Sequence, residues 1–119
     1  MHVVFLVMAF VAGAVLPLQL AANSAWGRAA GHPLLSSINN FVVGLVALVA
    51  LTAALRVPMP AGGKLAVLPW WAWIGGLFGA GFVGMSVWLA PKLGAAQWTV
   101  AIIAGQLCAA VVMDHFGWM

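Results

Sequence analysis

Charged side chains are almost absent from this sequence. They make up 4% of its 119 residues, and Asp114 is the single acidic residue. A soluble domain carries about 25% charged residues, so this chain lacks the polar side chains that would cover a globule in water. Hydrophobic residues make up 66% of the chain and the mean hydropathy is +1.19. The composition therefore predicts an integral membrane protein.

Cysteines, histidines and acids are also too few for most kinds of chemistry. Cys108 is the one cysteine, so no internal disulfide can form, and its apolar surroundings indicate a small core residue. His2, His32 and His115 lie in three separate parts of the sequence, so we expect no metal site. One carboxylate, without a second acid or an accessible nucleophile, leaves nothing for general acid–base or covalent catalysis. We therefore expect neither an enzyme nor a bound cofactor.

Four apolar runs have the length of a membrane-spanning helix. They cover approximately residues 2–22, 34–55, 68–90 and 94–113. About 20 residues at 1.5 Å each cross the ~30 Å hydrocarbon core of a bilayer. Little chain remains between the runs. The sequence thus predicts an all-α protein with one membrane domain, 1–119, of four transmembrane helices.

Polar residues inside the last run are the first candidates for function, because a polar group at that depth costs free energy unless it meets a partner or water. Gln106 lies about 18 Å along the run from Gly94. Trp98 lies on nearly the same helix face, so an aromatic ring and an amide could share a pocket. An interhelical hydrogen bond that holds the bundle together is the alternative role for Gln106. Asp114 ends the run.

Further polar groups lie near the facing ends of the first two runs. Gln19 and Asn23 are one helical turn apart and share a face; they either line a site or reach the membrane edge and cap the helix. Asn39 belongs to a polar stretch that either caps the second helix or lines the mouth of a cavity, and that stretch contains Ser36, Ser37, Asn39 and Asn40. The predicted substrate-binding residues are Gln19, Asn23, Asn39, Trp98, Gln106 and Asp114.

Glycine is concentrated in the third run at helical spacing. Gly75 and Gly79 form a GxxxG pair, Gly76 and Gly84 belong to a second stripe of small residues, and Gly105 belongs to another in the fourth run. Such stripes let membrane helices approach closely, whereas glycine also weakens a helix and lets it bend. We expect these five glycines to pack helices, with bending during transport as the alternative.

The basic residues give the chain no preferred orientation in the bilayer. With four helices, Arg28 and Lys92 lie on one side of the membrane, and Arg56 and Lys64 lie on the other. The positive-inside rule is then balanced two against two, so we predict insertion both ways up. Two opposite copies would form an antiparallel homodimer of eight helices, the equivalent of an inverted repeat. The four cations form no basic patch, so we expect no nucleic-acid partner.

Short motifs from the first helix to the final residues carry a family resemblance. The most specific are Gly105-Gln106-Leu107 and Asp114-His115-Phe116-Gly117. They follow Pro17-Leu18-Gln19 with Asn23, Pro69-Trp70-Trp71 with Gly75, Gly76 and Gly79, and Leu93-Gly94-Ala95-Ala96. With these motifs the chain resembles the YdcZ-type family of the drug/metabolite transporter superfamily, which is related to small multidrug resistance transporters. The resemblance implies a multi-pass transporter of the bacterial inner membrane that works by alternating access as an antiparallel dimer.

The sequence departs from small multidrug exporters in its first helix, which has no acid where they carry an essential glutamate. A buried carboxylate supplies proton coupling and attraction for cations, so its absence argues against a proton/polyaromatic-cation antiporter. A pocket of amides and tryptophans suits a neutral, zwitterionic or weakly charged small molecule. The alternative is a non-transporting membrane subunit or one half of a heterodimeric transporter. Many relatives continue past the Asp-His-Phe-Gly motif into a further helix, so the sequence is expected to be either a natural four-helix form or one from which a segment has been removed.

Overall fold

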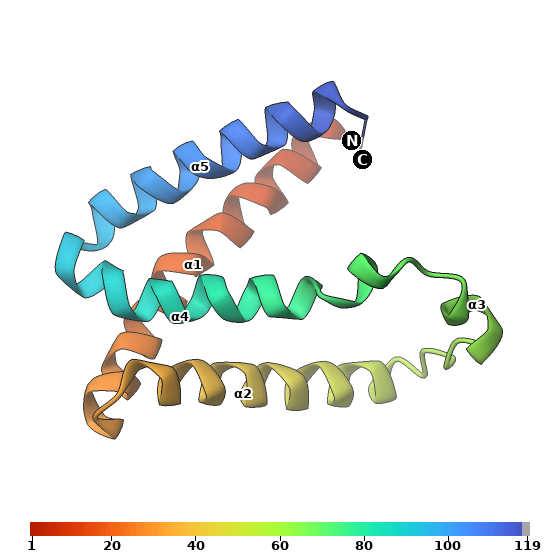
Figure 1. Ribbon diagram of the computed structural model, residues 1–119, viewed down its shortest axis with the longest axis horizontal. Coiled ribbons are helices and arrows are strands. Elements are labelled where there is room, and N and C mark those ends of the chain that lie inside the picture. Colours follow the sequence, from red (N-terminus) through yellow and green to blue (C-terminus); the bar gives the residue numbers. More distant parts are fainter. Residues whose placement is uncertain (118–119) are drawn as a thin grey trace.

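The computed structural model describes residues 1–117, except the side chain of Lys64, and this part of the chain is all helical (Figure 1). Four helices are long and apolar enough to cross a membrane. They are α1 (His2–Ala30), α2 (Pro33–Ala54), α4 (Gly75–Leu93) and α5 (Ala95–His115). The connection between α2 and α4 contains the short helix α3 (Gly62–Ala66) and the 3₁₀ turn η1 (Trp70–Trp73). The predicted all-α membrane architecture is confirmed at this level.

The first helix is longer than predicted. The apolar run ends near residue 22, but α1 continues to Ala30 and ends at Gly31, whose φ of 80° gives the left-handed C-cap typical of glycine. The polar residues after Asn23 do not stop the helix, because none of them is a strong helix breaker. Pro17 lies inside α1. Its ring nitrogen has no hydrogen to donate to the carbonyl of Gly13, four residues earlier.

The third helix begins later than predicted, at Gly75 rather than near residue 68. Pro69 has extended backbone angles (φ −64°, ψ 150°), and the tryptophans that follow it form η1 instead of the first turn of the helix. Proline disfavours helical angles in the residue before it and lacks an N–H donor. The second and fourth runs, predicted at 34–55 and 94–113, agree with α2 and α5 within two residues.

α2 and α4 run side by side along most of their length, whereas α1 and α5 separate from α4 toward one end of the molecule (Figure 1). The opposite end contains the turn between α1 and α2 and the turn at Gly94 between α4 and α5. We call it the packed end, because the buried residues lie there: Asn23, Gly27, Ser36, Ser37, Ser86, Val87, Ala90 and Trp98. The other end, which we call the splayed end, contains both termini of the described chain and the connection between α2 and α4.

Small and polar residues allow the close approach at the packed end. A Cβ atom on Gly27 of α1 would lie 3.4 Å from Ser36 Cβ of α2 and 3.4 Å from Val87 Cγ1 of α4. The Ser36 hydroxyl donates a hydrogen bond to the backbone carbonyl of Asn23 across the α1–α2 hairpin. This combination of small residues and interhelical hydrogen bonds is typical of helix packing in membranes. By contrast, α5 packs mainly against α4 and diverges from it toward the splayed end (Figure 1).

Candidate functional site

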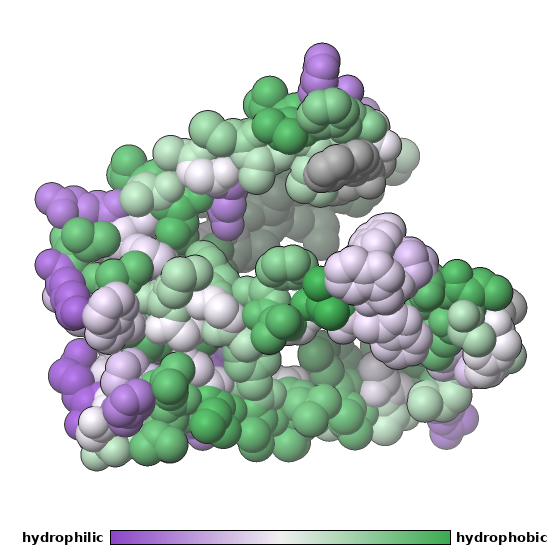
Figure 2. All heavy atoms as spheres, in the orientation of Figure 1, coloured by the Kyte–Doolittle hydropathy of each residue, from purple (hydrophilic) through white to green (hydrophobic). Residues whose placement is uncertain are grey.

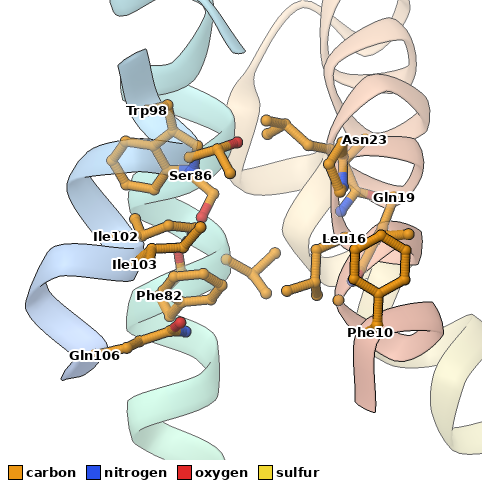
Figure 3. Close-up of a pocket in the computed structure, with 16 residues that line it drawn as sticks. Phe10, Leu16, Gln19, Asn23, Phe82, Ser86, Trp98, Ile102, Ile103 and Gln106 are labelled. Carbon is orange, nitrogen blue, oxygen red and sulfur yellow. Dashed lines mark hydrogen bonds between the residues drawn. The ribbon is translucent and has the colours of Figure 1, made fainter. Parts of the chain in front are cut away.

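A pocket of about 400 Å³ lies between α1, α4 and α5 (Figure 3). Its walls are mostly aliphatic and aromatic, and none of the described residues that line it is charged. Among its aromatic residues, Phe82 of α4 and Trp98 of α5 pack together with ring centroids 6.4 Å apart. The polar lining residues are Gln19, Asn23, Ser86, Thr99 and Gln106. The pocket therefore combines an apolar body with uncharged hydrogen-bonding groups, the usual composition of a small-molecule site.

Four of the six predicted substrate-binding residues line this one pocket. Gln19 and Asn23 approach it from α1, and Trp98 and Gln106 approach it from α5, on the opposite side of the cavity (Figure 3). In the sequence, each of the two α1 residues lies at least 75 residues from each of the two α5 residues. The structure thus brings together residues that the sequence analysis selected separately because each is polar or aromatic within an apolar run.

The other two predicted residues lie elsewhere. Asn39 is half-buried on α2 and is not part of the pocket lining. Asp114 is exposed near the C-terminal end of α5, two helical turns beyond Gln106. Nothing in the fold of a single chain places either side chain with the pocket residues. A role in substrate binding for Asn39 or Asp114 stays a prediction that this pocket does not support.

Asn40, the neighbour of Asn39, takes part in the site indirectly. Its side-chain Oδ1 accepts a hydrogen bond from Gln19 Nε2 at 2.9 Å and another from Asn23 Nδ2 at 3.2 Å. Both amides of α1 are therefore held by one residue of α2. Each NH₂ group donates one hydrogen to Asn40. The side-chain oxygens of Gln19 and Asn23 accept no hydrogen bond within residues 1–117 and are available as acceptors for a ligand.

The sequence contains a signal for Asn40 in the register of the first hairpin. Asn23 lies eight residues before Gly31, and Asn40 lies eight residues after His32. Residues equally far from the turn of an antiparallel helical hairpin lie at the same level. The same count pairs Gly27 with Ser36, which lie together at the packed end. Sequence reasoning missed both pairs because the length of α1, and therefore the position of the turn, was underestimated.

Gln106 differs from the two amides of α1. Its side chain forms no hydrogen bond with any other residue in the described range 1–117. The interhelical hydrogen bond that was the alternative role for Gln106 is therefore not formed within this chain. An amide that lines an apolar pocket without a partner is available to bind a ligand.

The five glycines expected to pack helices divide into two groups. A Cβ atom would lie 3.7 Å from the Phe41 ring at Gly79 and 3.8 Å from the Leu34 side chain at Gly84, so both face α2. Gly75, Gly76 and Gly105 have no neighbouring atom within 4 Å of such a Cβ position. Packing at these three positions needs a second chain and stays a prediction.

A comparison with models of protein families assigns the chain to one family. A family model described as "Putative inner membrane exporter, YdcZ" matches residues 4–119. No curated protein and no solved structure matches the chain. The match agrees with the four helices long and apolar enough to span a membrane, and with a multi-pass protein of the bacterial inner membrane. It also confirms the resemblance found in the motifs: the chain belongs to the YdcZ family of inner-membrane exporters.

Proposed function

We propose that this protein exports a small molecule that binds in the pocket between α1, α4 and α5. The observation that carries the proposal is the convergence of Gln19, Asn23 and Gln106 on one cavity inside the apolar part of the chain. Polar groups at membrane depth are costly and mark substrate pathways. A pocket of about 400 Å³ is within the range of roughly 300–1,000 Å³ that small-molecule sites occupy.

The pocket chemistry favours an uncharged or zwitterionic, amphipathic substrate. A carboxylate is the group that best replaces the hydration of a cation, and no acid is among the described residues that line the pocket. The Phe82–Trp98 pair provides a flat apolar surface on one side. The carbonyl oxygens of Gln19 and Asn23 provide hydrogen-bond acceptors on the other. A molecule with an apolar body and one donor group, such as a hydroxyl, satisfies both sides.

We further propose that two oppositely oriented copies form the working unit. In one chain, the helices around the pocket are packed at one end and separated at the other (Figure 1). An antiparallel pair places one packed end and one splayed end at each membrane face. When the two copies adopt different conformations, the site between them opens to one membrane face. Exchanging the two conformations opens it to the other face, which is alternating access. The balance of Arg28 and Lys92 against Arg56 and Lys64 supports insertion in both orientations.

The substrate site is tested by replacing an amide side chain of the pocket and measuring solute transport in reconstituted liposomes. A screen of uncharged and zwitterionic amphipathic solutes first identifies one that protein-containing liposomes transport and empty liposomes do not. We expect Gln106→Ala to abolish this transport while the dimer remains intact. Gln97→Ala is the matched control, because Gln97 lies on the same helix, is exposed and does not line the pocket. Unchanged transport by Gln106→Ala would remove Gln106 from the site.

The dimer is tested separately by labelling in cells. Cys108 is replaced by alanine, and a single cysteine is placed at Ala61, in the connection between α2 and α4. An impermeant thiol reagent is applied before and after permeabilisation. Reaction of about half of the sites from outside is the result expected for dual topology. Reaction from one side alone excludes an antiparallel homodimer and favours one half of a heterodimeric transporter.

A further inference from the structure

A second pocket lies at the packed end, apart from the transport pocket. Its volume is about 230 Å³, and it is bordered by the last turns of α1, the start of α2 and the last turns of α4. The chemically relevant lining residues are Ser24, Arg28 and Trp88. None of these residues lines the larger pocket. The proposed transport function makes no use of this site.

One cation lines this pocket, and a second cation, from another helix, stacks on a ring of its wall. Arg28, in the last turn of α1, lines it directly. Lys92, in the last turn of α4, places its Nζ atom 3.6 Å from the centroid of the Trp88 ring, and that ring is part of the pocket wall. A cation–π contact of this kind orients the ammonium group. At least two of its three N–H groups stay free to bind an anion.

Within residues 1–117, neither cation has a carboxylate partner. Asp114 is the single acid of the sequence, and it lies near the far end of α5, about 30 Å of helix away from the Gly94 turn. Among residues 1–117, no acidic side chain lies at the packed end. Hydrophilic residues gather at this end of the molecule in the space-filling view (Figure 2). An anion from outside the chain is therefore the natural counterion.

We propose that this pocket binds the phosphate group of an anionic phospholipid. The planar guanidinium of Arg28 can donate two parallel hydrogen bonds to phosphate oxygens, Lys92 adds a point charge, and the Ser24 hydroxyl adds a donor. A basic pocket between transmembrane helices is the usual binding site for anionic lipid head groups.

The level of the pocket favours a lipid over a soluble phosphate. Trp26 on α1 and Trp88 on α4 are 41% and 54% exposed at this end, as expected for tryptophans at the membrane interface. The helix surfaces that continue from the packed end are apolar and exposed, so acyl chains can lie along them. A soluble phosphate would make the same polar contacts without this apolar contribution.

Arg28 and Lys92 also lie at helix C-termini, where a cation counters the helix dipole. That role needs no ligand and predicts no dependence on lipid charge. The experiment therefore compares lipids. The protein is purified in detergent, and its melting temperature is measured with phosphatidylglycerol, with phosphatidylcholine of the same acyl chains, and with inorganic phosphate.

We expect phosphatidylglycerol to raise the melting temperature, and the other two additions to leave it unchanged. Arg28→Gln with Lys92→Gln should reduce the phosphatidylglycerol shift by more than half. Arg56→Gln with Lys64→Gln is the matched control, because it removes the same charge from the other side of the membrane, and it should retain the shift. A shift that survives in the first double variant, or that inorganic phosphate reproduces, overturns the proposal.

Native mass spectrometry gives a second readout that does not depend on the variants folding. The wild-type protein, released from micelles containing equal amounts of the two lipids, should retain phosphatidylglycerol in preference to phosphatidylcholine. Equal retention contradicts the proposal.

Asp114→Asn tests the remaining counterion, the carboxylate of a second, oppositely oriented copy. A phosphatidylglycerol shift that appears in Asp114→Asn and not in the wild type assigns the cations to that carboxylate and overturns the lipid site.

Discussion

The packed and splayed ends of the molecule are built from different kinds of residue. At the packed end, glycine, serine and alanine bring three helices together, and a hydrogen bond joins α1 to α2. At the splayed end, large apolar side chains such as Phe10 and Phe78 are 79% and 70% exposed. Because lipid accepts apolar surface as readily as protein does, close packing in a membrane depends on small and polar residues. The comparison indicates a fixed end and an end that rearranges at low cost.

The largest effect is expected from breaking the packed end at Gly27. Gly27→Leu places a branched side chain where Ser36 and Val87 already lie 3.4 Å from a Cβ atom, so it should lower stability by about 1–3 kcal/mol. Gly44→Leu is the control, since Gly44 has no neighbouring atom within 4 Å of its Cβ position. Melting temperatures in detergent measure both variants. Equal melting temperatures would show that the α1–α2–α4 contact does not hold this end together.

A smaller effect is expected from the amide cluster that links the packed end to the transport pocket. Asn40→Leu removes the acceptor of Gln19 and Asn23 and should cost about 1 kcal/mol, since interhelical hydrogen bonds in membranes average ~0.6 kcal/mol each. Solute transport should also weaken, because both amides lose their orientation. Asn39→Leu, which leaves both hydrogen bonds in place, should affect stability and transport less. The reverse order of the two variants would contradict the assigned role of Asn40.

The smallest effect is expected at the splayed end. Phe78→Ala removes a ring that is 70% exposed, so it should lower the free energy of unfolding by no more than about 0.5 kcal/mol. The melting temperature in detergent measures this change. Phe82→Ala, one turn further along α4, removes the ring that packs on Trp98 and should cost more, about 0.5–1.5 kcal/mol for the aromatic pair alone. A larger loss at Phe78 would show that the splayed end is covered by a partner chain in the purified protein.

Composition and polar positions were enough to predict much of this molecule. Apolar length gave the four spanning helices, and polarity inside those runs selected Gln19, Asn23 and Gln106, which share a pocket. The start of α4 was placed too early, because hydropathy continues through Pro69 and the tryptophans after it while the backbone does not form α-helix there.

The direction in which each helix faces could not be predicted in the same way. In water, an apolar stripe shows which face of a helix is buried, but a membrane helix is apolar on all sides because lipid covers what protein does not. The choice of Asn39 over Asn40 shows this, since the two neighbours point about 100° apart. Deciding between them requires the hairpin register, which depends on the turn at Gly31 and His32.

Pro17 has a consequence for how the transport site can change during evolution. Its missing N–H leaves the carbonyl oxygen of Gly13 without its usual helical donor, and Gly13 and Pro17 both line the pocket. That oxygen belongs to the main chain, so substitution of the side chain at position 13 leaves it in place. Substitutions of the amides and aromatic rings around the pocket can therefore change the choice of substrate, while this one acceptor stays in place as long as Pro17 is kept.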